Sequence, residues 1–137
     1  MKKYGIFCID DDNIINNVTK FQINSVANKG VHVVESFDDP LEAMHELKNY
    51  ARDNIDISVC LVDFQMPKMQ GDQFIRSLKQ HFPACRCIML SGNSSASLVS
   101  DLVEDNLLEH YISKPWEKLD LLQKINHCLP ITAKLSL

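Results

Sequence analysis

The sequence has no long hydrophobic run, no cluster of basic residues and no paired cysteine motif, and each absence excludes a class of protein. Its apolar runs are far shorter than the roughly 20 residues that cross a membrane. The run after Met1-Lys2-Lys3 ends at Asp10, which is too short for a secretory signal. With 14 Lys and Arg against 18 Asp and Glu, the net charge of −4 argues against direct nucleic-acid binding. We therefore expect a cytoplasmic protein with no membrane contact.

The five cysteines and five histidines follow no metal-binding or disulfide pattern in the sequence. The cysteines are Cys8, Cys60, Cys85, Cys87 and Cys128, and no pair has the C-x-x-C spacing. The histidines are His32, His45, His81, His110 and His127. The spacing predicts free thiols and structural histidines, with neither a zinc site nor a disulfide framework.

Short apolar runs alternate with helical patterns along the whole chain. The predicted strands are 4–9, 31–37, 57–62, 86–90 and 111–112. The predicted helices are 13–28, one opening at 38–40, one around 74–78, one around 98–103, and 119–129. The first is indicated by the helical spacing of Ile14, Ile15, Val18, Phe21, Val26 and Ala27, and Gly30 is the expected stop signal after it. This alternation indicates an α/β fold, with a parallel sheet, right-handed crossovers and helices on both faces.

The length of 137 residues suits a single domain, and no linker, repeat or low-complexity tract divides it. We expect the domain to span residues 1–130. Residues 131–137 are expected to be a short C-terminal tail, with no output domain.

Polar residues stand where four of the predicted strands end. These residues are Asp10-Asp11-Asp12, Asp63, Ser91-Gly92-Asn93 and Ser113-Lys114-Pro115. The carboxyl ends of parallel strands meet at one edge of the sheet, where ligands bind in open α/β folds. We therefore expect these side chains to form one site.

Three carboxylates at that edge would repel one another. At separations of about 5 Å, Asp10, Asp11 and Asp63 would do so by roughly 3 kcal/mol per pair at an effective dielectric constant near 20. A hard cation with oxygen ligands, Mg²⁺ or Mn²⁺, would relieve this repulsion, and Lys114 could neutralise the remainder. Such a site could also hold a phosphoryl group, with Ser91 as a hydrogen-bond donor and one carboxylate as the nucleophile.

These motifs and their order resemble a known family, the receiver domain of two-component response regulators, and in particular its single-domain chemotaxis type. The matching segments are Ile9-Asp10-Asp11-Asp12, 61–71 (LVDFQMPKMQG), Met89-Leu90-Ser91-Gly92 and Tyr111-Ile112-Ser113-Lys114-Pro115. The resemblance covers residues 4 to about 129. It implies a doubly wound, flavodoxin-like (βα)5 fold, whose five parallel strands have the order 2-1-3-4-5.

The resemblance also implies a role for each acidic residue. Asp63 would be the phosphoacceptor and a metal ligand. Asp11 would bind Mg²⁺ (or Mn²⁺) directly, and Asp10 mainly through water. Gln65 would contribute its backbone carbonyl, and its side chain, with that of Asn93, would tune dephosphorylation.

The remaining motif residues would stabilise the phosphoryl group or respond to it. Ser91 and Lys114 would contact that group, and the Lys114-Pro115 peptide bond would be cis. Tyr111 matches an aromatic residue that rotates on activation, and Trp116 would report on the site by fluorescence. Two departures from the family pattern are Gly92, where Ala is more usual, and Trp116, where Phe is commoner.

A receiver of this kind is a signalling phosphoacceptor, not an enzyme acting on external substrates. It would take its phosphoryl group from a sensor histidine kinase or a histidine phosphotransfer protein. Phosphorylation would then alter the surface of the fourth helix, fifth strand and fifth helix for a downstream protein partner. The same surface would serve for dimerisation.

Two alternatives remain open from the sequence. Asp10-x-Asp12 resembles the nucleophile motif of haloacid-dehalogenase-type phosphatases, although Ile14 stands where those enzymes have Thr or Val. The second alternative is a degenerate receiver that binds partners without being phosphorylated. Hydrolysis of a generic phosphate ester would identify the first, and the absence of metal binding the second.

Overall fold

The computed structural model describes residues 1–92 and 96–137. Its strands are β1 (Lys3–Ile9), β2 (His32–Phe37), β3 (Ile55–Asp63), β4 (Arg86–Ser91) and β5 (His110–Ser113). Its helices are α1 (Asn13–Asn24), α2 (Pro40–Arg52), α3 (Gly71–His81), α4 (Ala96–Glu104) and α5 (Lys118–Cys128), followed by the 3₁₀-helix η1 (Ile131–Ala133). Among the described residues, no helix is long and apolar enough to span a membrane.

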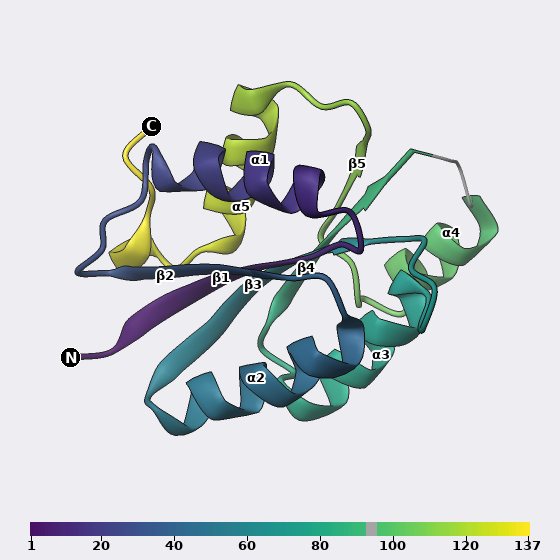
Figure 1. Ribbon diagram of the computed structural model, residues 1–137, viewed down its shortest axis with the longest axis horizontal. Coiled ribbons are helices and arrows are strands. Elements are labelled where there is room, and N and C mark those ends of the chain that lie inside the picture. The colour runs from purple at the N-terminus through teal and green to yellow at the C-terminus, as the bar shows by residue number, and fades with distance from the viewer. Residues whose placement is uncertain (93–95) are drawn as a thin grey trace.

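The strands form one parallel sheet in the order β2-β1-β3-β4-β5. Helices α1 and α5 cover one face of this sheet, and α2, α3 and α4 cover the other (Figure 1). The predicted doubly wound α/β fold and its strand order are therefore confirmed. All strands point the same way, so the ends of β1, β3, β4 and β5 reach a common edge.

Alternating residues of the buried strands supply two apolar layers. In β1, Phe7 and Ile9 pack into the layer on the side of α2, α3 and α4. Their neighbours Ile6 and Cys8 pack into the layer on the side of α1 and α5. Each large aliphatic or aromatic side chain buried in this way stabilises the fold by about 1.5–3 kcal/mol. The five cysteines are free thiols and are buried.

Aspartate side chains begin the first two helices. The Oδ1 atom of Asp12 accepts hydrogen bonds from the backbone nitrogens of Ile14 at 2.9 Å and Ile15 at 3.4 Å. Asp39 caps α2 in the same way, and Pro40 occupies its first turn. These caps satisfy backbone N–H groups that have no partner inside a helix.

The prediction of a first helix over 13–28 was wrong at its end, because α1 stops at Asn24. Hydrogen bonds within a local turn take up the backbone of Asn28: its carbonyl accepts from Val31 and His32, and its N–H donates to Nδ1 of His32. Gly30 does not act as a left-handed helix stop, since no described glycine has a positive φ.

The α1 helix also turns an unexpected face to the sheet. Its buried residues are Asn16, Thr19 and Ile23. The apolar residues Ile14 and Phe21, whose spacing indicated the helix, are 73% and 76% exposed. The apolar spacing thus identified a helix but not the face that it buries.

The last residues of the chain fold back against the α1–β2 turn. Ala133 and Leu135 are buried there. Nε2 of His32 lies 2.7 Å from the carbonyl oxygen of Ala133, and the backbone nitrogen of Ser136 donates to the carbonyl of Val26 at 3.0 Å. This segment extends the apolar layer beneath α1 and α5.

Candidate functional site

Three aspartates meet at the carboxyl edge of the sheet. Asp10 follows β1, Asp63 ends β3, and Ile9 lies beside Val62 in the ladder between these strands. One carboxylate oxygen of each of Asp10, Asp11 and Asp63 lies within 4.8 Å of the other two. Asp10 and Asp63 are buried, whereas Asp11 is exposed. The structure thus brings together the acidic residues that the sequence pointed to.

Lys114 joins the two buried carboxylates. Its Nζ atom lies 2.8 Å from Oδ2 of Asp10 and 2.8 Å from Oδ1 of Asp63. The backbone nitrogen of Lys114 donates to the carbonyl of Ser91 at 2.9 Å, which ties the lysine to the end of β4. The Lys114-Pro115 peptide bond is cis, as expected.

Burial and charge shift the ionisation of this group. Burial raises the pKa of Asp63, and Asp10 and Asp11 raise it further, while the hydrogen bond from Lys114 lowers it; the resulting pKa is about 6. Burial alone would lower the pKa of Lys114, but the hydrogen bonds and charges of Asp10 and Asp63 outweigh it, so that pKa is raised. Lys114 is therefore a cation at neutral pH, whereas ionisation of Asp63 destabilises the folded state.

Hydrogen bonds from three residues fix the position of Asp10. Its Oδ1 atom accepts from the backbone nitrogen of Asp12 at 2.9 Å, and its Oδ2 atom accepts from Lys114. Its backbone carbonyl accepts from Nδ2 of Asn16 at 2.7 Å, and the same nitrogen lies 3.2 Å from the carbonyl of Phe37. Sequence reasoning missed Asn16, a buried residue whose side chain hydrogen-bonds to the backbone at the ends of both β1 and β2. No sequence signal pointed to Asn16, because the apolar spacing of the first helix favoured a different face as the buried one.

The loop after β3 is held tightly against the strand that carries Asp63. The backbone nitrogen of Phe64 donates to the carbonyl of Leu90 at 3.0 Å, and that of Gly71 donates to the carbonyl of Phe64 at 2.7 Å. A Cβ atom on Gly71 would collide with the carbonyl oxygen of Asp63. Only glycine lets α3 begin this close to the acidic group.

Gln65 lies on this loop and is exposed. It lines a hollow of about 410 Å³ together with Asp11, Met66, Pro67 and Gln70. The hollow gives solvent and ligands access to the exposed carboxylate of Asp11.

The other predicted residues lie on or next to β4 and β5. Ser91 is buried and pairs with Ser113, and Tyr111 pairs with Met89 and packs against the layer under α2, α3 and α4. A Cβ atom added to Gly92 would meet no atom within 4 Å. Asn93 lies outside the described residues.

Trp116 connects this edge of the sheet to α1. Its Nε1 atom donates to Oε1 of Gln22 at 2.9 Å. It also lines a largely apolar hollow of about 380 Å³ with Lys114, Pro115, Ile15, Val18 and Gln22. Trp116 is thus two residues along the chain from Lys114, whose ammonium group bridges the buried carboxylates of Asp10 and Asp63.

A family model and a curated relative both match most of this chain. The family model of the response regulator receiver domain matches residues 6–126. Chemotaxis protein CheY of Bacillus subtilis (strain 168) is 25% identical over 126 residues, which cover 92% of this chain and 98% of that protein.

Solved structures agree with this match. A CheY-like response regulator receiver domain protein from Methanospirillum hungatei JF-1 has a TM-score of 0.76 and 25% identity, and the match covers 91% of this chain and 92% of that one. The CheX–CheY–BeF₃–Mg²⁺ complex from Borrelia burgdorferi has a TM-score of 0.75 and 24% identity, with 90% and 87% of the two chains covered. The family match spans most of the sequence, and the fold and strand order agree with it. The chain therefore belongs to the response regulator receiver domain family.

Proposed function

We propose that Asp63 accepts a phosphoryl group from a phosphohistidine, in a reaction that depends on Mg²⁺ or Mn²⁺. Receiver domains are signalling proteins, not classical enzymes, and imply a histidine kinase or histidine phosphotransfer protein as partner. The observation that carries the proposal is the single ammonium of Lys114 shared between the buried carboxylates of Asp10 and Asp63, with Asp11 beside them.

The donor set suits a hard divalent cation. Asp11 and Asp63, with the backbone carbonyl of Gln65, would be its protein ligands, and Asp10 would act mainly through water. All of these atoms are oxygens, which Mg²⁺ and Mn²⁺ prefer. When bound, the ion would neutralise charge on the carboxylates and on the phosphoryl oxygens. The similar structure from Borrelia burgdorferi is described as a complex of CheX and CheY with BeF₃ and Mg²⁺, which supports a site of this type.

The oxygen of Asp63 that does not bind Lys114 is the one we assign as nucleophile. Lys114 contacts Oδ1, so Oδ2 would form the O–P bond while the P–N bond of the phosphohistidine breaks. The electron pair of that bond stays on the imidazole nitrogen of the donor. With a pKa of about 6, Asp63 is mostly ionised, and so nucleophilic, at neutral pH.

Lys114 and Ser91 would then stabilise the phosphoryl group. Asp10 keeps Lys114 in place while the carboxylate of Asp63 reacts, because the ammonium is bonded to both residues. Gln65, on the exposed loop, and Asn93 would tune the approach of water to the acyl phosphate.

Phosphorylation would bias the domain between two states. Ser91 and Tyr111 lie on the paired strands β4 and β5, so a pull on the Ser91 hydroxyl can reach the Tyr111 ring. The surface of α4, β5 and α5 would change for a downstream protein partner, provided that the phosphoryl group binds one state better. Dimerisation through this surface, a domain spanning residues 1–130, and a cytoplasmic location all stay predictions.

The experiment is intact-mass analysis of the protein after incubation with a small phosphodonor and Mg²⁺. We expect one added phosphoryl group in the natural sequence and none in Asp63→Asn. Asp56→Asn is the matched control, because Asp56 lies near the other end of β3, and it should still be labelled. Equal labelling of Asp63→Asn would refute the assignment. Mg²⁺ binding without any labelling would also contradict it, and the absence of both would favour the degenerate receiver.

A further inference from the structure

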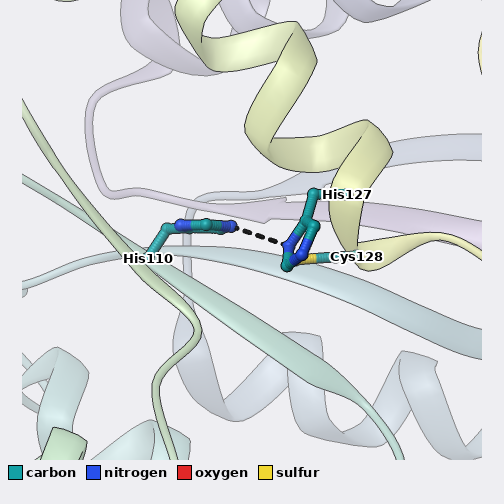
Figure 2. A group of neighbouring side chains, drawn as sticks. All are labelled: His110, His127 and Cys128. Carbon is teal, nitrogen blue, oxygen red and sulfur yellow. Dashed lines mark hydrogen bonds between the residues drawn. The ribbon is translucent and has the colours of Figure 1, made fainter.

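A second cluster of ligand-bearing side chains lies at the opposite edge of the sheet from the aspartates. His110 is the first residue of β5, whereas Lys114 follows the end of that strand. His127 and Cys128 are the last two residues of α5, and they face His110 (Figure 2). One ligand atom of each of the three lies within 4.8 Å of the other two. The proposed phosphoacceptor mechanism makes no use of this cluster.

The two imidazole rings are already close to the separation found in a metal site. Nε2 of His110 and Nδ1 of His127 are 3.1 Å apart, and the rings meet edge to face at 66°. Two nitrogens bound tetrahedrally at about 2.0–2.1 Å from one Zn²⁺ would be separated by about 3.3–3.4 Å. Only a small movement is needed, and the exposed side chain of His127 can make it.

The sulfur of Cys128 completes a third side of the cluster, next to a hollow in the surface. Cys128 is buried, but together with His127 it lines a hollow of about 270 Å³. This hollow provides a path for an ion and room for a water molecule as a further ligand. Two acidic residues near the cluster are already paired, Glu109 with Arg86 and Asp120 with Lys124.

We propose that His110, His127 and Cys128 bind Zn²⁺, with water as the fourth ligand. Mg²⁺ prefers oxygen donors, whereas thiolate and imidazole are both ligands that suit zinc. The Cys128 thiol would release its proton to solvent on binding. The ring proton now shared between the two histidines would move to the outer nitrogen of its ring, because each facing nitrogen needs a lone pair for the metal.

A bound ion would connect the beginning of β5 with the end of α5. Both elements belong to the surface proposed to respond to phosphorylation, so zinc would hold two of its parts together. The competing interpretation is structural: a hydrogen bond between two histidines, with Cys128 as part of the apolar layer under α1 and α5. That interpretation predicts no selective binding of zinc.

Co²⁺ is the probe for the test, because a cobalt–thiolate bond gives a charge-transfer absorption that oxygen ligands do not. Titration of the purified full chain should produce this band at one equivalent, and Zn²⁺ should remove it. Cys128→Ser and His127→Asn should each weaken binding at least about 100-fold, since loss of a direct ligand should exceed the 10–100-fold effect of outer partners. His45→Asn, an exposed histidine on α2, and Asp11→Asn, in the acidic site, should leave the band unchanged.

Thermal melting supplies a second readout that does not depend on cobalt. With Mg²⁺ in excess to fill the acidic site, Zn²⁺ should raise the melting temperature of the natural protein and of His45→Asn, but not that of His127→Asn, because a ligand of the folded state stabilises it by mass action. His127 is exposed, so this variant should fold normally. The proposal is overturned if no thiolate band appears at stoichiometric Co²⁺, or if the band persists in both ligand variants.

Discussion

Replacing Asp63 with Asn should stabilise the domain at neutral pH, although it removes the proposed phosphoacceptor. Burial and the neighbouring Asp10 and Asp11 raise the pKa of Asp63 from 3.8 to about 6, even after the attraction of Lys114. Each pKa unit is worth 1.36 kcal/mol, so keeping Asp63 ionised destabilises the folded state by about 3 kcal/mol at high pH. Asn at this position avoids that cost and keeps an oxygen that can accept a hydrogen bond from Lys114.

The sign of the pH dependence follows from the raised pKa. A carboxyl group whose pKa is higher in the folded state adds stability below its ordinary pKa, and that stability is lost as the pH rises through about 4 to 6. Asp63→Asn should therefore exceed the natural protein in free energy of unfolding by about 3 kcal/mol at pH 7.5, but by only about 1 kcal/mol at pH 4.5. Adding Mg²⁺ should stabilise the natural protein and narrow the gap at pH 7.5.

Urea unfolding followed by far-UV circular dichroism, with divalent ions chelated, measures these differences. Asp101→Asn, an exposed change on α4, is the control and should stay within about 0.5 kcal/mol of the natural protein at both pH values. A destabilised Asp63→Asn at pH 7.5, or a difference that is the same at both pH values, would refute the reasoning.

Three further predictions concern the surroundings of the site. Asn16→Ala should lower the free energy of unfolding by about 1–3 kcal/mol in urea titrations, because the carbonyls of Asp10 and Phe37 lose their shared donor; an unchanged stability would contradict this role. Gly92→Ala should raise the free energy of unfolding by about 0.4–1 kcal/mol, since its Cβ meets open space and φ is not positive; a loss of stability would show a hidden clash. Trp116 fluorescence should change when Mg²⁺ and beryllofluoride are added together, and a flat response would count against coupling between the site and the start of α5.

The acidic site was largely predictable because its signals are local. Asp10, Asp63 and Lys114 each follow an apolar strand, and in a parallel sheet the ends of neighbouring strands must meet. That argument does not reveal how the groups pair. In the structure Lys114 contacts Asp10 as closely as Asp63, and this arrangement depends on side-chain geometry that no spacing encodes.

The first helix and the histidine cluster show where sequence patterns stop being informative. The spacing of Ile14 and Phe21 predicted a helix correctly, but these residues are exposed, and Asn16 faces the sheet instead. Periodicity identifies an apolar face and not the surface that this face meets. Likewise, His110 and Cys128 have no metal-binding spacing in the chain, and only the fold brings the start of β5 and the end of α5 together.

Chemical trapping of the phosphorylated residue tests the central claim most directly. Borohydride reduces an aspartyl phosphate to homoserine, so peptide mass mapping after treatment with a phosphohistidine donor and Mg²⁺ shows which aspartate carried the phosphoryl group. The account predicts conversion at Asp63 alone, and none when the divalent ion is chelated. Conversion at Asp10 or Asp11 in place of Asp63, or a phosphoryl group attached to a residue other than aspartate, would contradict it.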